Sequence, residues 1–526
     1  MRAFALKKTL IKNKTQMKTL KKIFAMMMTV ATVAVMAACA GANGDEASFI
    51  PKNATYVMHI DVASLWQKGE LANADDLQTV RSLRSSLRSE SPALDEMVGA
   101  MLKDPSSCGI DFGQQVCLFT DIDVETSGAV DGHIVVSAAM RSRSNFDKFL
   151  KELEDNADLD IDLEEEDGQT LVAFDDNVMM LFNDKRIFLA SNISGRDDMV
   201  AYLESLANLK PKNSMAGVKK FQKYLAERKD VNLYLDYDRV MGNTIVSQSM
   251  LQLYGADITN AMRDCAYCMA GSFEKGRITF DFKAYNLPDI GEQRFNAALL
   301  DYMPSEVLSA ATFAIDIPML MKMLASMGRE NNFDFMDLDE PIEVKDYTVR
   351  DLINAFGGSF AIDFYGMRDD DGIPLVAAAL DVKNETLVHD LLREAGLMAD
   401  ANGLYNLSAI LPAWLYVGHG MAVASTDPAV ASRAAQGQKG NGMMAVASKA
   451  KKGNYFYIDL NKNNWPQGLM QAIGIYNDPV ADLVLGLLDH FEVENVRTDE
   501  GTATLFFSNE KENSLAFILQ TLDKLN

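Results

Sequence analysis

Apolar and polar residues alternate along many short stretches of this chain, which is typical of a strand with one solvated face. Residues 279–283, for example, read Thr-Phe-Asp-Phe-Lys. A short Gly-containing segment at 274–276 separates the runs 267–273 and 277–285. We therefore predict a β-hairpin over these two runs.

Helical spacing occurs between the strand-like runs. Phe146, Phe149, Leu150 and Leu153 would share one face of a helix. Helices separated by several adjacent strands favour the α+β class. We expect a mainly antiparallel sheet with helices packed on one face.

The order of these elements occurs twice. Asp61 at the end of an early strand has a counterpart in Asp316, and the hairpin at Gly276 has one at Gly501. We predict two tandem related α+β units, the first over 49–295 and the second over 296–526. Further runs match in the same order: 112–119 with 356–364, 131–140 with 371–380, 187–191 with 421–425, and 233–236 with 456–459.

The N-terminus has the composition of an export signal. Residues 1–38 contain basic residues but no acidic residue, and they end in an uncharged run at 23–38. That run is shorter than the roughly 20 residues of a membrane span. It ends in Val-Met-Ala-Ala before Cys39, which resembles the lipobox of bacterial lipoproteins. The resemblance implies a lipoprotein signal peptide over 1–38, lipidation of Cys39, and a flexible tether over 39–48.

Two alternatives to this interpretation stay open. Residues 1–38 could be a plain signal peptide with an incidental Cys39, or an N-terminal membrane anchor. Met17 is a second candidate for the start of translation beside Met1. Ala40 follows Cys39 where the inner-membrane retention signal of lipoproteins has Asp. We expect an outer-membrane lipoprotein, with the periplasmic or cell-surface face undecided.

Residues 49–65 contain Phe-Ile-Pro-x-x-Ala-x-Tyr-Val followed by Ile-Asp-x-x-x-Leu. Together with the lipobox, this motif resembles a family of large Bacteroidetes lipoproteins that is known as a domain of unknown function. The resemblance extends over about residues 20–526 and implies an envelope location. It supplies no catalytic residues.

Composition narrows the classes of function. The chain has 526 residues and a formal net charge of −24. Nucleic-acid binding requires a basic surface that displaces counterions, so we expect no nucleic-acid partner. Hydrophobic residues make up 48% of the chain, which indicates a globular protein and excludes a disordered one.

Acidic residues are the first candidates for chemistry. Four aspartates each end a predicted strand before a helix-like stretch: Asp61, Asp236, Asp316 and Asp459. We interpret them as helix N-caps and not as metal ligands or acid–base catalysts.

The acidic run 152–167 resembles the start of a calcium loop. Leu163 occupies the position of the required glycine, so we predict a solvated acidic loop.

The cysteines and histidines do not match the sequence pattern of a catalytic or metal site. Cys265 and Cys268 form a C-x-x-C pair, and Cys108 with Cys117 forms a second pair. Export would permit structural disulfides among these four, but spacing does not decide whether they form. The five histidines form no close ligand pair. We predict no metal, no cofactor and no catalytic residues.

Three functions remain in view. The first is a non-enzymatic, lipid-anchored binding or structural module of the cell envelope, with its ligand or envelope protein partner in the groove between the two units. The second is an envelope hydrolase acting on glycan or peptide through paired carboxylates. The third is a carrier of apolar ligands, suggested by the 30 Met and 3 Trp residues.

Overall fold

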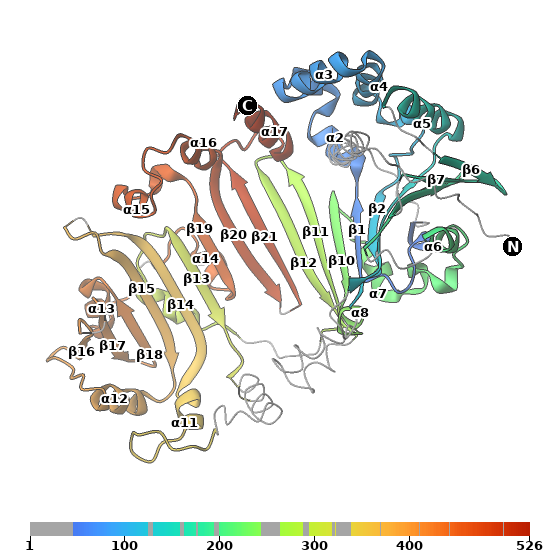
Figure 1. The fold of residues 1–526 in the computed structure, drawn as a ribbon. Helices are drawn as coiled ribbons and strands as arrows, with labels where there is room; N and C mark the ends of the chain where they lie inside the picture. The colour runs from blue at the N-terminus through green and yellow to red at the C-terminus, as the bar shows by residue number, and fades with distance from the viewer. Residues whose placement is uncertain are drawn as a thin grey trace.

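The computed structural model describes residues 46–124, 130–157, 162–174, 177–193, 199–242, 264–287, 294–317, 321, 338–368, 370–409, 411–440, 442–497 and 499–525. Within these residues a long sheet crosses the molecule from end to end, and helices pack against it (Figure 1). The protein is mixed helix and sheet with antiparallel strand pairing. The predicted signal peptide and Cys39 lie outside the described residues.

Among the described residues, nineteen strands form this sheet, and a separate pair, β3 (Asp123–Val124) and β4 (Val130–Asp131), forms a small second one. From edge to edge the large sheet consists of β6 (Asp162–Glu166), β7 (Gln169–Ala173), β8 (Val178–Phe182), β9 (Arg186–Asn192), β5 (His133–Ala139), β2 (Val116–Thr120), β1 (Tyr56–Ile60), β10 (Val231–Asp236), β11 (Ala266–Glu274), β12 (Arg277–Tyr285), β21 (Glu500–Phe507), β20 (Leu488–Arg497), β19 (Tyr455–Asp459), β13 (Ser309–Ala314), β14 (Phe356–Met367), β15 (Pro374–Val382), β18 (Met421–Ser425), β17 (Trp414–Gly418) and β16 (Leu404–Asn406).

The described helices connect these strands. They are α2 (Val62–Lys68), α3 (Gln78–Glu90), α4 (Pro92–Lys103), α5 (Arg143–Ala157), α6 (Met199–Ala207), α7 (Lys219–Leu225), α8 (Tyr237–Gly242), α11 (Val349–Asn354), α12 (Glu385–Glu394), α13 (Pro428–Ala435), α14 (Ala447–Ala450), α15 (Gln467–Ala472), α16 (Pro479–Leu487) and α17 (Ser514–Leu525). Short 3₁₀ turns are η1 (Glu46–Phe49), η2 (Leu71–Asp76), η3 (Pro105–Cys108), η4 (Pro211–Asn213), η5 (Met215–Gly217), η6 (Ala297–Tyr302) and η7 (Lys462–Asn464).

Strands β12 and β21 pair in the middle of the sheet, from Arg277 opposite Phe506 to Lys283 opposite Glu500. On one side of this joint the order outwards is β12, β11, β10, β1, β2, β5, β9, β8, β7, β6. On the other side it is β21, β20, β19, β13, β14, β15, β18, β17, β16. When β6 at the far edge is set aside and the other nine strands on each side are numbered along the chain, the two orders are identical.

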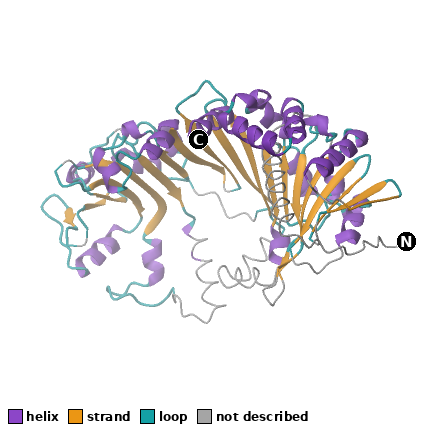
Figure 2. Ribbon diagram, turned by 45° about the horizontal axis from the view of Figure 1, so that its top comes forward, coloured by secondary structure: helices purple, strands orange, loops and turns teal. Residues whose placement is uncertain are grey.

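Helices cover both faces of the sheet in the first half of the chain (Figure 2), which corrects the expectation of a single covered face. Val57 of β1 lies beside Tyr234 of β10, and both are buried with Phe221 of α7. Ile60 lies on the opposite face, where it packs with Leu65 of α2. The run 56–60 has apolar residues on both faces, so burying it requires two layers of helix.

Two local predictions are confirmed. Strands β11 and β12 form the predicted hairpin, and Gly276 in its turn has φ +68°, a backbone conformation that favours glycine. The predicted helix is α5, in which Phe146, Leu150 and Leu153 are buried.

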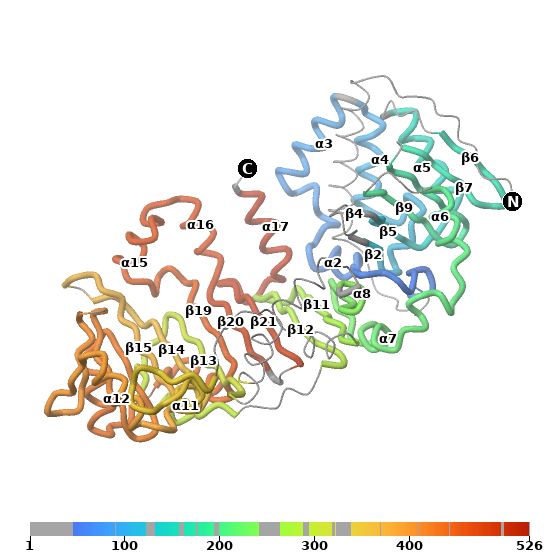
Figure 3. Tube along the Cα trace, turned by 60° about the horizontal axis from the view of Figure 1, so that its bottom comes forward, coloured from blue at the N-terminus to red at the C-terminus, as the bar shows by residue number. Residues whose placement is uncertain are grey.

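The C-terminal helix α17 returns to the first half of the chain (Figure 3). Leu515 of α17 is buried in a core that includes Leu65 and Leu71. Asp523 accepts hydrogen bonds from the backbone N–H groups of Gln78 and Thr79, both at 2.7 Å. One core of the first half is therefore completed by the last helix of the chain.

Candidate functional site

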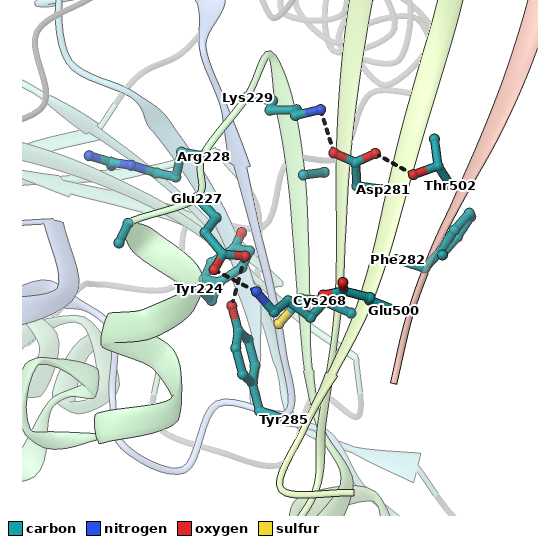
Figure 4. A pocket seen from close by; sticks show the side chains of 14 residues that line it. Tyr224, Glu227, Arg228, Lys229, Cys268, Asp281, Phe282, Tyr285, Glu500 and Thr502 are labelled. Carbon is teal, nitrogen blue, oxygen red and sulfur yellow. Dashed lines mark hydrogen bonds and ion pairs between the residues drawn. The ribbon is translucent and has the colours of Figure 1, made fainter. Parts of the chain in front are cut away.

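A pocket of about 490 Å³ lies at the middle of the sheet, where β11, β12 and β21 run beside the turn that follows α7 (Figure 4). Its residues come from both of the predicted units, because β21 belongs to the second. The lining residues are Tyr224, Ala226, Glu227, Arg228, Lys229, Cys268, Ala270, Asp281, Phe282, Lys283, Tyr285, Glu500, Gly501 and Thr502.

Strand register determines which side chains form the floor of the pocket. Asp281 and Lys283 are two residues apart on β12, so their side chains leave the same face of the sheet. Asp281 lies opposite Thr502 of β21, and Lys283 lies between Cys268 of β11 and Glu500 of β21. The alternating polar positions of β12 thus point into the pocket.

One ion pair joins the floor to the turn. The Nζ atom of Lys283 lies 2.7 Å from Oε1 of Glu227, and the Tyr285 hydroxyl donates to Oε2 of Glu227 at 3.2 Å. The Lys283 ammonium group also lies 5.5 Å from the centre of the Tyr285 ring. Burial, with the neighbouring Cys268 and Glu227, raises the pKa of Tyr285, so this phenol stays a hydrogen-bond donor.

A second ion pair lies one step along β12. The Nζ atom of Lys229 donates to Oδ2 of Asp281 at 2.5 Å, and the Thr502 hydroxyl donates to Oδ1 of Asp281 at 3.0 Å. Glu227 and Lys229, which come from the same turn, therefore pair with oppositely charged residues of the pocket floor. The turn supplies one negative and one positive side chain, and β12 supplies the positive and the negative partner.

Arg228, between these two residues, points the other way (Figure 4). Its Nη1 atom donates to Oε2 of Glu46 at 2.8 Å and to Oε1 of Gln115 at 3.0 Å. The turn thus places two charged side chains in the pocket and one in a buried ion pair behind it.

The four aspartates predicted as helix caps do not come together in this pocket. Asp61 caps α2, accepting from Ser64 N at 2.8 Å. Asp236 precedes α8 and accepts from Asp238 N at 3.1 Å. Asp459 accepts from Asn461 N at 2.8 Å but is not the predicted cap, because the N-cap of the following turn η7 is Asn461. The stretch that follows Asp316 falls largely outside the described residues.

The acidic run is a strand in part, which corrects the predicted loop. Residues Asp162–Glu166 form β6 and pair with β7, and their side chains are mostly exposed. A solvated acidic segment forms a strand here because it is an edge strand, where only one neighbour has to be paired. In the part of the chain that the structure describes, no group of three or more His, Cys, Asp or Glu side chains is arranged to hold a metal ion.

The four cysteines of the described chain are free thiols, so neither pair forms the disulfide that spacing left open. Cys265 donates to the Asn286 carbonyl at 3.2 Å. Cys268 lies in the pocket, and burial raises its pKa to about 12. Burial likewise raises the pKa of Cys117 to about 12 and that of Cys108 to about 11. These shifts disfavour thiolate chemistry.

The sequence did not single out the residues that form the pocket. Asp281 and Lys283 stand out in the sequence only as polar positions of an alternating strand, and no pattern distinguishes Glu227 or Lys229. Oppositely charged residues two apart on one strand face were the available signal. The turn that contains Glu227 and Lys229 comes close to Asp281 and Lys283 only because α7, which precedes it, packs beside the sheet.

Comparison with known proteins gives a family but no activity. The family model described as domain of unknown function DUF4836 matches residues 47–414, and the chain belongs to this family. No curated protein matches the chain. Among solved structures, crystal form III of TP0453 is 9% identical, with a TM-score of 0.25, and the match covers 48% of this chain and 84% of that one. Crystal form IV of TP0453 is 11% identical, with a TM-score of 0.23 over 46% and 83% of the two chains.

No helix among the described residues is long and apolar enough to cross a membrane.

Proposed function

We propose that this member of the DUF4836 family is a non-enzymatic, lipid-anchored protein of the outer membrane that binds a small zwitterionic ligand. Cys39 would carry the lipid, as the sequence before it suggests. The observation that carries the binding function is the 490 Å³ pocket with its two pairs of opposite charge.

The charge arrangement indicates the class of ligand. Glu227 faces Lys283, and Lys229 faces Asp281, so positive and negative groups alternate around the pocket. A ligand with one ammonium and one carboxylate group would find a partner for each. A singly charged ligand that separated one of these ion pairs would leave the other member of the pair unmatched in a partly desolvated site, which costs binding free energy. Amino acids and short peptides with free termini have the required chemistry.

We also propose that the chain arose by duplication of one α+β unit, with the boundary near residue 295. The identical order of nine strands on each side of the β12–β21 joint, with β6 as an additional edge strand, supports this proposal. In this interpretation the pocket lies at the seam between the copies, where ligands of two-unit proteins commonly bind.

Calorimetry on the whole chain tests the binding function. Glycine and glycylglycine are the zwitterionic probes, and acetate, methylammonium and glucose are the singly charged and neutral comparisons. We expect a zwitterionic probe to bind and the three comparisons not to bind. Equal binding of all five probes, or binding of none, would refute the proposal.

Two variants localise the binding. Lys283→Gln should lower the affinity for the bound probe at least tenfold. The matched control is Lys462→Gln, because Lys462 and Asp482 form an ion pair of the same 2.7 Å length and similar exposure away from the pocket. Equal loss in both variants would contradict the assignment. Cleavage of glycylglycine, followed by NMR, would replace the binding function with the hydrolase alternative.

A further inference from the structure

The segment that follows the predicted lipid anchor is attached to the wall of the pocket. Glu46, the first described residue, is fully buried, and its carboxylate accepts from Arg228 at 2.8 Å. Arg228 lies between Glu227 and Lys229, whose side chains make the two ion pairs of the pocket. A single ion pair therefore connects the start of the fold to the turn that supplies half of the pocket's paired charges.

Further contacts hold this segment in place. The Ile50 carbonyl accepts from Met215 N at 2.9 Å, and Lys52 N donates to the Asn213 carbonyl at 2.8 Å. Because these contacts fix residues 50–52 independently of Glu46, loss of the Glu46 charge would free the turn without releasing the whole segment. Removal of one partner from a buried ion pair leaves the other charge uncompensated, so Arg228 would have to move toward water.

We propose that Glu46 is a positioning residue for the pocket, and that it couples the segment 46–52 to the turn 226–229. Glu46 holds Arg228 behind the turn, and this fixes the direction in which Glu227 and Lys229 project. Seven residue steps separate Cys39 from Glu46, and an extended chain spans at most about 3.6 Å per step. With a lipid on Cys39, Glu46 would stay within about 25 Å of the membrane surface.

The consequence for ligand affinity rests on the proposed function, but the positioning itself can be measured without a ligand. Cys268 lines the pocket and is partly exposed, whereas Cys108, Cys117 and Cys265 are at most 2% exposed. The rate at which each thiol of the full chain reacts with a maleimide at pH 8, read by mass spectrometry, therefore reports separately on the pocket and on global unfolding.

We expect Glu46→Gln to raise the labelling rate of Cys268 at least fivefold and to leave the three buried thiols unchanged. The matched control is Asp95→Asn, which removes the charge of another buried carboxylate that is paired with an arginine, Arg84, at 2.8 Å between α3 and α4. It should leave the Cys268 rate unchanged. An unchanged Cys268 rate in Glu46→Gln, or equal acceleration of all four thiols, would overturn the proposal.

A ligand measurement separates the two proposals. If glycine or glycylglycine binds the parent protein, Glu46→Gln should weaken that binding at least threefold while Asp95→Asn does not. If neither probe binds but the Cys268 rate responds as expected, the positioning role of Glu46 stands and the zwitterion-binding function fails.

Discussion

The ammonium group of Lys283 lies 2.7 Å from the carboxylate of Glu227, although 56 residues separate them in the chain. Both side chains are partly exposed, at 31% and 52%. An ion pair in such a wet position contributes about 0–1 kcal/mol to stability. Folding therefore gains little from this pair, and we assign its role to the pocket.

This relationship predicts that stability and binding separate in Glu227→Gln. We expect its free energy of unfolding in urea to change by less than about 1 kcal/mol. The affinity for the bound zwitterionic probe should fall at least tenfold, because the pocket loses the partner of an ammonium group. A parallel loss of both quantities would show that the pair is structural.

A second prediction concerns Asp363 of β14, which lies opposite Ala310 of β13. Its carboxyl group is fully buried, neither oxygen has a hydrogen-bond partner among the described residues, and burial raises its pKa from 3.8 to about 8. Between these values the folded protein keeps a proton that the unfolded chain releases. Stability should therefore fall as the pH rises from about 4 to about 8, by an amount on the order of 5 kcal/mol.

Urea unfolding at pH 5, 6.5 and 8 measures this loss. Asp363→Asn removes the titrating group, so the stability of that variant should change less over the same range. Identical pH dependence in the two proteins would mean that Asp363 does not hold its proton in the folded state.

A third prediction follows from α17. Leu515 is 2% exposed in a core shared with the first half of the chain. Leu515→Ala should lower the free energy of unfolding by about 2–5 kcal/mol through the cavity it leaves. Leu522 of the same helix is 52% exposed, so Leu522→Ala should change stability by less than about 0.5 kcal/mol. Equal effects would contradict the docking of α17.

A fourth prediction tests the anchor at Cys39. Cys39→Ala should move the protein from the membrane fraction to the soluble fraction after cell lysis, because the acyl chains on Cys39 would anchor the protein in the membrane. If the variant stays with the membrane, the lipoprotein interpretation is wrong. Protease treatment of intact and lysed cells then decides between the cell-surface and periplasmic faces.

The thiols give a fifth prediction. Four free cysteines among the described residues mean that Cys108, Cys117, Cys265 and Cys268 should all be alkylated after unfolding without a reductant. Mass spectrometry of the digested protein checks each site. A disulfide-linked pair of peptides, formed before unfolding, would contradict the structure.

Local chemistry explains why some elements could be predicted from sequence. The hairpin of β11 and β12 was predicted within one residue, because a Gly at positive φ and flanking alternation are both local signals. The buried face of α5 was predicted for the same reason, since residues 146, 150 and 153 lie within a few turns of one helix.

Non-local pairing explains what could not be predicted. Asp281 faces Thr502 across the β12–β21 joint, 221 residues away in the chain, and no periodicity in either strand specifies that partner. The sequence also does not predict the second layer of helices over β1, because an apolar run indicates that a strand is buried but not which element covers it.

By itself, the sequence determined the class of the fold, the hairpin, the caps such as Asp61 and the acidic balance of the chain, because each depends on residues close together along the backbone. Only the tertiary structure decided that Glu227 and Lys229 meet β12, that Glu46 lies behind them, and that α17 completes the first half. These contacts join segments tens to hundreds of residues apart. Their geometry follows from how the helices pack on one continuous sheet.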